Sequence, residues 1–132
     1  MIVLDTNIVL DLFVFNDPAA QPLLQQLESG ALRWISTPAM REELARVLAY
    51  SQIVKSLAHH QTEPGKVLQR FDKHVRLLEP PAKAPVTCKD PDDQKFIDLA
   101  VAHQARLLSK DRAVLCMQKR LAALGVLAQA AI

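Results

Sequence analysis

The sequence contains little glycine, little cysteine and few aromatic residues. Its 132 residues include three glycines and two cysteines, and aromatic side chains account for 5%. The cysteines, Cys88 and Cys116, belong to no C-x-x-C pair and have no histidine at ligand spacing. These features argue against a disulfide-stapled scaffold and against a Cys/His zinc site, so we expect both thiols to be reduced and structural.

Long apolar runs and a dominant charge sign are missing as well. No run approaches the roughly 20 residues that a membrane-spanning helix requires, and the first residues lack the basic segment of a signal peptide. We therefore expect a cytoplasmic protein that does not enter a membrane. The 16 basic and 14 acidic residues give a net charge of +2, which does not by itself identify a nucleic-acid partner.

The apolar content is sufficient for one hydrophobic core. Half of the residues are hydrophobic, and a chain of this length buries roughly two-thirds of its unfolded surface. We predict one domain over residues 1–132, without internal repeats. The apolar pattern predicts short strands at 1–4, 33–36, 75–78, 106–109 and 126–127, and helices at 8–15, 18–28, 38–48, 53–57, 66–75, 91–103 and 112–124. Strands that alternate with helices predict an α/β fold with a parallel sheet between helix layers.

Two carboxylates follow predicted strands directly. Asp5 ends the first strand, where Thr6 and Asn7 are suitable helix N-caps, and Asp111 stands between the strand at 106–109 and the last helix. Ligands of open α/β sheets bind beyond the carboxyl ends of the strands, so both residues are candidate functional groups. A simple helix cap would account for either residue as well.

Two more carboxylates lie toward the buried sides of predicted helices. Asp93 shares the inward face of its helix with Phe96, whereas Asp98 lies on the opposite face and is expected in solvent. Glu43 lies near the edge of the buried arc of the helix at 38–48. Its competing interpretation is a boundary residue paired with Arg41 or Arg46.

The predicted helix that contains Asp93 begins with residues that are typical of a helix N-terminus. Asp90 followed by Pro91 is typical of an N-cap and first helical residue, and Asp92 adds a negative charge that complements the helix dipole. This signal accounts for Asp90 without any ligand role.

Four carboxylates brought together would repel one another unless a cation were present. A hard divalent ion such as Mg²⁺ or Mn²⁺ fits oxygen ligands better than zinc does. Such a centre suits phosphodiester hydrolysis by metal-activated water.

The motifs in this order resemble the PIN-domain family of small Mg²⁺-dependent ribonucleases. The motifs that carry the resemblance are Leu4-Asp5-Thr6-Asn7, Glu43-Leu44, Asp92-Asp93 leading to Phe96, and Ser109-Lys110-Asp111. The resemblance implies a three-layer α/β/α sandwich with a central parallel sheet of four to five short strands. It implies that Asp5, Glu43, Asp93 and Asp111 form an acidic catalytic and metal-binding quartet, supported by Thr6, Asn7, Asp92 and Ser109.

The direct ligand could be either Asp92 or Asp93, and the helical face favours Asp93. Within the family, the chain looks most like the branch of VapC-like toxins from toxin–antitoxin pairs, in which a stretch like Asp90-Pro91-Asp92-Asp93 opens the late helix. This implies RNA as substrate, a cognate antitoxin as a possible partner and a possible homodimer. The alternative is a PIN-fold module that binds RNA or a protein and has little or no nuclease activity.

Overall fold

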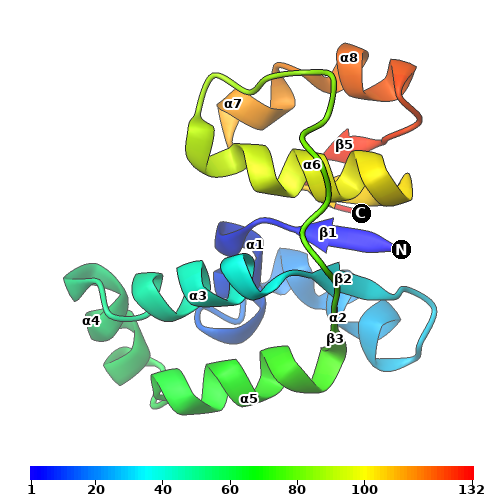
Figure 1. The fold of residues 1–132 in the computed structure, drawn as a ribbon. Helices are drawn as coiled ribbons and strands as arrows, with labels where there is room; N and C mark the ends of the chain where they lie inside the picture. Colours follow the sequence, from blue (N-terminus) through cyan, green and yellow to red (C-terminus); the bar gives the residue numbers. More distant parts are fainter.

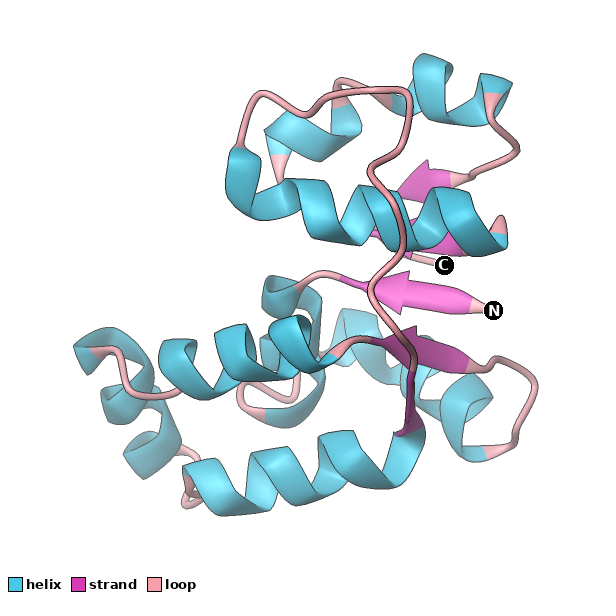
Figure 2. Ribbon diagram, viewed as in Figure 1, coloured by secondary structure: helices cyan, strands magenta, loops and turns pink.

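The computed structural model describes all 132 residues as a five-stranded parallel sheet with helices on both faces (Figures 1 and 2). The strand order is β3-β2-β1-β4-β5, and every neighbouring pair is parallel. The strands are β1 (Ile2–Leu4), β2 (Trp34–Ser36), β3 (Val75–Leu77), β4 (Arg106–Leu108) and β5 (Ala128–Gln129). The predicted fold class, an α/β/α sandwich with a central parallel sheet, is confirmed.

Alternate residues of β1 enter two different hydrophobic cores. Ile2 and Leu4 pack on one face of the sheet, and Val3 packs on the other; none of the three is more than 3% exposed. A strand that is buried on both faces explains why its sequence is continuously apolar rather than alternating.

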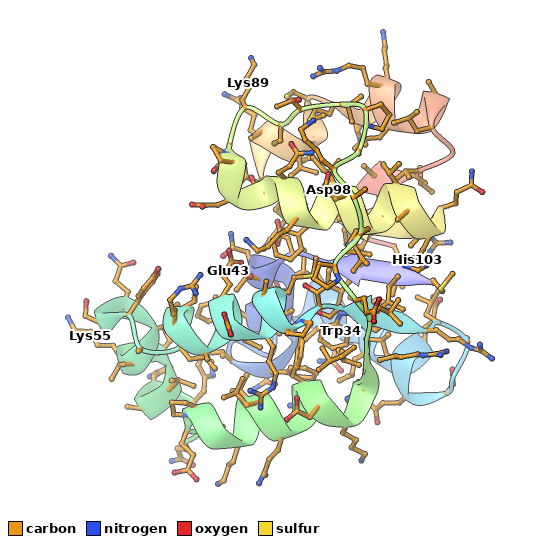
Figure 3. All side chains as sticks on the ribbon, in the orientation of Figure 1. Trp34, Glu43, Lys55, Lys89, Asp98 and His103 are labelled. Carbon is orange, nitrogen blue, oxygen red and sulfur yellow. The ribbon has the colours of Figure 1, made fainter.

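The core under Ile2 and Leu4 is the larger one. Trp34 lies at its centre and packs edge-on against Phe71, with 5.1 Å between ring centroids (Figure 3 shows Trp34 between the sheet and α5). The helices that contribute to this core are α1 (Thr6–Phe13), α2 (Gln21–Glu28) after the 3₁₀ turn η1 (Pro18–Ala20), α3 (Pro38–Val47), α4 (Ser51–His59) and α5 (Pro64–His74).

The core under Val3 is covered by the later part of the chain. Its helices are α6 (Gln94–His103), which follows the 3₁₀ turn η2 (Pro91–Asp93), α7 (Arg112–Leu115) and α8 (Gln118–Ala123), and α3 adds Met40. None of the helices combines the length and apolar character that crossing a membrane requires.

Several helix starts follow the sequence signals. Thr37 caps α3 by accepting from the Met40 N–H, and Asp90 caps η2 by accepting from the Asp92 N–H. The first helix begins earlier than predicted, at Thr6, because Asp5 rather than Thr6 or Asn7 is its cap.

The end of the chain differs from the prediction in two ways. The single helix expected at 112–124 is divided into α7 and α8. The division occurs because the Met117 N–H donates to the carbonyl of Val114, three residues earlier, and not to the fourth preceding residue as in an α-helix. The last strand lies at Ala128–Gln129 rather than 126–127, because the Val126 N–H still bonds to Leu121 at the end of α8.

Asp98 is not in solvent as predicted. It is half-buried, and one carboxylate oxygen accepts from the Ala84 N–H at 2.9 Å and from the Gln94 Nε2 at 2.8 Å. These bonds hold the long connection from β3 against α6, where Figure 3 labels Asp98.

Replacing Asp98 with alanine should therefore destabilise the protein. The lost acceptor leaves the Ala84 N–H unpaired, so we expect the free energy of unfolding to fall by about 1–2 kcal/mol in urea denaturation. Glu28→Ala, which removes an exposed carboxylate with no hydrogen bond, is the control. Equal unfolding midpoints for the two variants would show that the bonds of Asp98 do not fix this connection.

Candidate metal centre

The pairing of β1 with β4 sets Asp5 beside Ser109. Leu4 lies opposite Leu108 in the parallel register, so the residues that follow these two strands emerge together at the carboxyl edge of the sheet. The Ser109 hydroxyl donates to the Asp5 carboxylate and accepts from the Asp111 N–H at 3.0 Å. Asp5 and Ser109 are both buried, so this network is shielded from solvent.

Asp93 reaches the same edge from the turn η2. It is 8% exposed, and its Oδ2 atom is buried without any hydrogen-bond partner. A buried polar atom without a partner is unfavourable unless another group, such as an ion, satisfies it. Its neighbour Asp92 is exposed, so Asp93 is the better placed of the two for a role in the interior of the site.

Asp93 lies in a group of three carboxylates. Asp90, Asp93 and Asp111 each offer an oxygen atom, and these atoms lie within 4.8 Å of one another. Asp90 was not among the predicted site residues, because its N-cap signal accounted for it completely. The structure shows that the same side chain caps η2 and faces two other carboxylates.

The crowded negative charges change the acidity of this group. Burial, together with the close approach of Asp111 and the charges of Asp90 and Asp5, raises the pKa of Asp93 to about 7. Burial also raises the pKa of Asp5, although the hydrogen bond from Ser109 opposes that shift. A divalent cation would relieve both effects, and carboxylate oxygens are the ligands that Mg²⁺ and Mn²⁺ prefer. The donor set and the orphaned Asp93 oxygen therefore fit such an ion.

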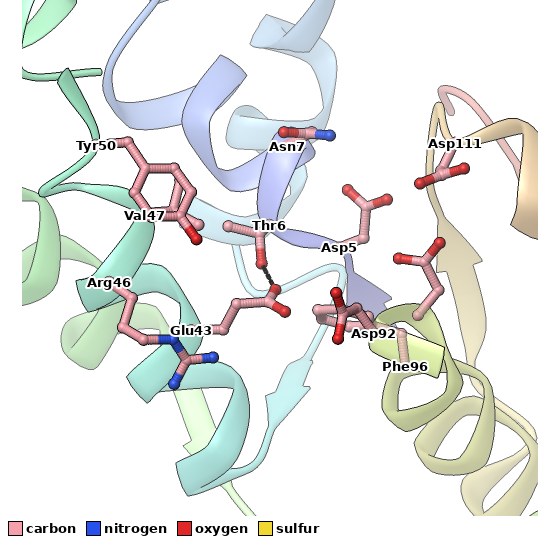
Figure 4. A pocket seen from close by; sticks show the side chains of 11 residues that line it. Asp5, Thr6, Asn7, Glu43, Arg46, Val47, Tyr50, Asp92, Phe96 and Asp111 are labelled. Carbon is pink, nitrogen blue, oxygen red and sulfur yellow. Dashed lines mark hydrogen bonds between the residues drawn. The ribbon is translucent and has the colours of Figure 1, made fainter. Parts of the chain in front are cut away.

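A pocket of about 240 Å³ joins Asp5, Asp93 and Asp111 to Glu43, whereas Asp90 does not line it (Figure 4). All members of the predicted quartet line it, together with the predicted supporting residues Thr6, Asn7 and Asp92. The remaining lining residues are Arg46, Val47, Tyr50 and Phe96. Ser109, the last predicted supporting residue, lies behind Asp5 rather than in the pocket wall.

Asp5 and Glu43, the other two members of the predicted quartet, are outside the group formed by Asp90, Asp93 and Asp111. The Glu43 carboxylate accepts from the Thr6 hydroxyl and forms an ion pair with Lys95, with 2.7 Å between Nζ and Oε1. Neither of the arginines considered from the sequence pairs with it. Arg41 instead forms a two-bond ion pair with Asp72 on α5.

Lys95 is a second site residue, after Asp90, that the sequence did not predict. Its ammonium group bridges Glu43 and the carbonyl oxygen of Asp92, and so links α3 to the first turn of α6. Charge balance calls for a cation near crowded carboxylates, but the local pattern around Lys95 does not indicate a partner 52 residues away.

Comparison with known proteins identifies one family. A family model described as PIN domain matches residues 1–113, a stretch that includes every carboxylate of the pocket. No curated protein and no solved structure matches the chain significantly.

The shift at Asp93 predicts an unusual pH dependence of stability. Between its ordinary pKa and about 7, the folded protein holds a proton at Asp93 that the unfolded chain has lost, so the metal-free stability falls as pH rises through this range. In EDTA, we expect Tm to decrease from pH 5 to pH 8. Mn²⁺ should raise Tm more at pH 8 than at pH 5, because the ion competes with the proton. A Mn²⁺ response that is equal at both pH values would contradict this account.

Substitutions at Asp93 and at its neighbour Asp92 show which of the two carboxylates binds the ion. Asp93→Asn removes a buried charge, so it should stabilise the metal-free protein at pH 8 by on the order of 1–2 kcal/mol and abolish the Mn²⁺ response of Tm. The matched variant Asp92→Asn, at the exposed neighbouring position, should change neither quantity. The assignment of Asp93 fails if Asp92→Asn alone loses the response.

Proposed function

The chain belongs to the PIN-domain family, and from this membership we propose that it is a Mg²⁺- or Mn²⁺-dependent endoribonuclease. PIN domains have a nuclease-type fold. The observation that carries the proposal is the buried, partnerless Asp93 oxygen within a group of carboxylates at the carboxyl edge of the sheet. A structural role alone would not require an arrangement that raises the pKa of Asp93 to about 7.

Asp90, Asp93 and Asp111, whose oxygens lie within 4.8 Å of one another, would hold the ion, and Asp5 would contribute from the adjoining pocket wall. Glu43 would complete the acidic wall from α3. When bound, the ion supplies an activated water for attack on the phosphorus and stabilises the leaving oxygen.

The chain's other residues keep these ligands in place. Ser109 orients Asp5 by donating to one carboxylate oxygen, and the Asp111 N–H fixes Ser109 in turn. Thr6 and Lys95 hold Glu43 at the rim. Such supporting bonds restrict the ligand rotamers, which is the usual contribution of groups around a metal site.

The choice of RNA and of a toxin role is a further part of this proposal. The choice of RNA rests on the resemblance to the PIN-domain family of ribonucleases, and the toxin role rests on the resemblance of the Asp90–Asp93 stretch to VapC-like toxins. A cognate antitoxin would silence such an enzyme by placing a basic side chain in the acidic pocket, much as Lys95 already neutralises Glu43 from within the chain. Cytoplasmic location and homodimer formation are expectations of the same proposal.

One observation favours the alternative of a binding module with little activity. The ion pair with Lys95 occupies a Glu43 oxygen that a full acidic quartet would leave open. If this pair persists in the presence of metal, the pocket has three available carboxylates from the quartet rather than four.

Cleavage of single-stranded RNA tests the proposal. The purified protein should cut RNA in Mg²⁺ or Mn²⁺ and not in EDTA, and Asp5→Asn should lower the rate by about 100-fold or more because it removes a ligand charge. Glu43→Gln should also reduce cutting. Glu42→Gln, at the exposed neighbouring position of the same helix, should not.

Two results would contradict the proposal. Cutting that persists in EDTA or in Asp5→Asn would exclude this centre as the catalyst. Divalent-ion binding without cutting of any RNA would favour the binding-module alternative.

A further inference from the structure

The chain's only tyrosine stands exposed at the rim of the acidic pocket. Tyr50 is 58% exposed, and its ring lies on the wall opposite Asp111 (Figure 4). Its hydroxyl makes no hydrogen bond within the chain, whereas its backbone is fixed by bonds to Val47, Ile53 and Val54. An exposed aromatic ring with a free hydroxyl, carried by a hydrogen-bonded stretch of backbone, is suited to contact a ligand.

Tyr50 also separates the acidic pocket from a second hollow. This hollow has a volume of about 370 Å³ and shares Asn7, Val47 and Tyr50 with the acidic pocket. Its remaining lining residues are Leu10, Ser51, Gln52 and Ile53, so apolar and polar side chains both line it. Ligand sites commonly combine apolar and aromatic walls with a few polar groups.

Arg46 lies near the end of α3, four residues before Tyr50 in the bend that leads into α4, and lines the same acidic pocket. It is exposed and forms no salt bridge, although Glu43 is three residues away on α3. Thr6 and Lys95 already satisfy the Glu43 carboxylate. The Arg46 guanidinium is therefore free to bind an anionic group that enters the pocket from solvent.

We propose that Arg46 and Tyr50 form a subsite for one nucleotide of single-stranded RNA beside the metal centre. Arg46 binds a backbone phosphate, and Tyr50 stacks on an unpaired base that occupies the second hollow. The choice of RNA rests on the proposed nuclease function. The subsite itself lies outside the carboxylate group and makes a separate claim, namely that Arg46 and Tyr50 bind the nucleotide next to the metal centre.

The requirement for a single strand follows from the geometry of stacking. Tyr50 can stack only on a base whose face is accessible, and the bases of a duplex are already stacked on one another. Arg46 alone would not make this distinction, because both forms present phosphates. Discrimination between single strand and duplex therefore tests Tyr50 specifically.

Fluorescence anisotropy of a labelled RNA oligonucleotide measures this binding without cleavage. The measurement uses the full chain in the Asp5→Asn background with Mg²⁺, and compares the single strand with its duplex. We expect Tyr50→Ala to weaken single-strand binding by about 5- to 100-fold, and Tyr50→Phe to bind within about twofold. Leu127→Ala is the control, because Leu127 is 56% exposed and lies outside both hollows.

The role of Arg46 has its own readout. Arg46→Ala should reduce the slope of log affinity against log salt concentration by about 0.7, the value for one phosphate contact on a single strand, and Arg46→Lys should largely restore it. An unchanged slope in Arg46→Ala would overturn the phosphate contact.

The outcomes separate this proposal from the nuclease function. If the wild-type protein cuts RNA in an Asp5-dependent manner but Tyr50→Ala binds like Leu127→Ala, the subsite is wrong and the nuclease remains. If binding depends on Tyr50 and Arg46 but no RNA is cut, the nuclease is wrong and the subsite remains. Equal affinity for duplex and single strand, or no RNA binding at all, overturns the subsite.

Discussion

Buried negative charge at the carboxyl ends of β1 and β4 is the constraint on which the site depends. The parallel register fixes Asp5 next to Ser109. The turn η2 adds Asp93 from the helix layer that covers the other face of the sheet from α1. Hydrogen bonds satisfy Asp5, but one Asp93 oxygen has no partner within the chain. The chain itself therefore does not compensate the negative charge of the site. A small bound cation is the simplest group that would compensate it.

The pocket joins walls of different chemistry, and this arrangement connects the proposed metal centre with the proposed nucleotide subsite. The carboxylates near β1 and β4 favour a cation, whereas Arg46 and Tyr50 on the opposite wall favour a phosphate and a base. Lys95 lies at the boundary, where it pairs with Glu43. A polyanionic substrate would be repelled by the carboxylates alone. A bound cation and the exposed guanidinium together make its approach favourable.

The sequence predicted the parts of the site that follow from local periodicity. Asp5 could be placed because it follows an apolar strand, and Asp93 because its helical face is apolar. Asp90 was explained by its capping role, since one local pattern serves both a helix start and a possible ligand. The partner of Lys95 and the anchoring bonds of Asp98 depend on segments far apart in the chain. Periodicity within one segment contains no information about such contacts.

Crystals of the protein soaked in Mn²⁺ would test the central claim most directly, through the anomalous signal of the metal. The account predicts an anomalous peak bound by the Asp93 Oδ2 atom and by at least one of Asp5 and Asp111. A peak elsewhere on the surface, or no peak while the Asp93 oxygen is still without a partner, would contradict it.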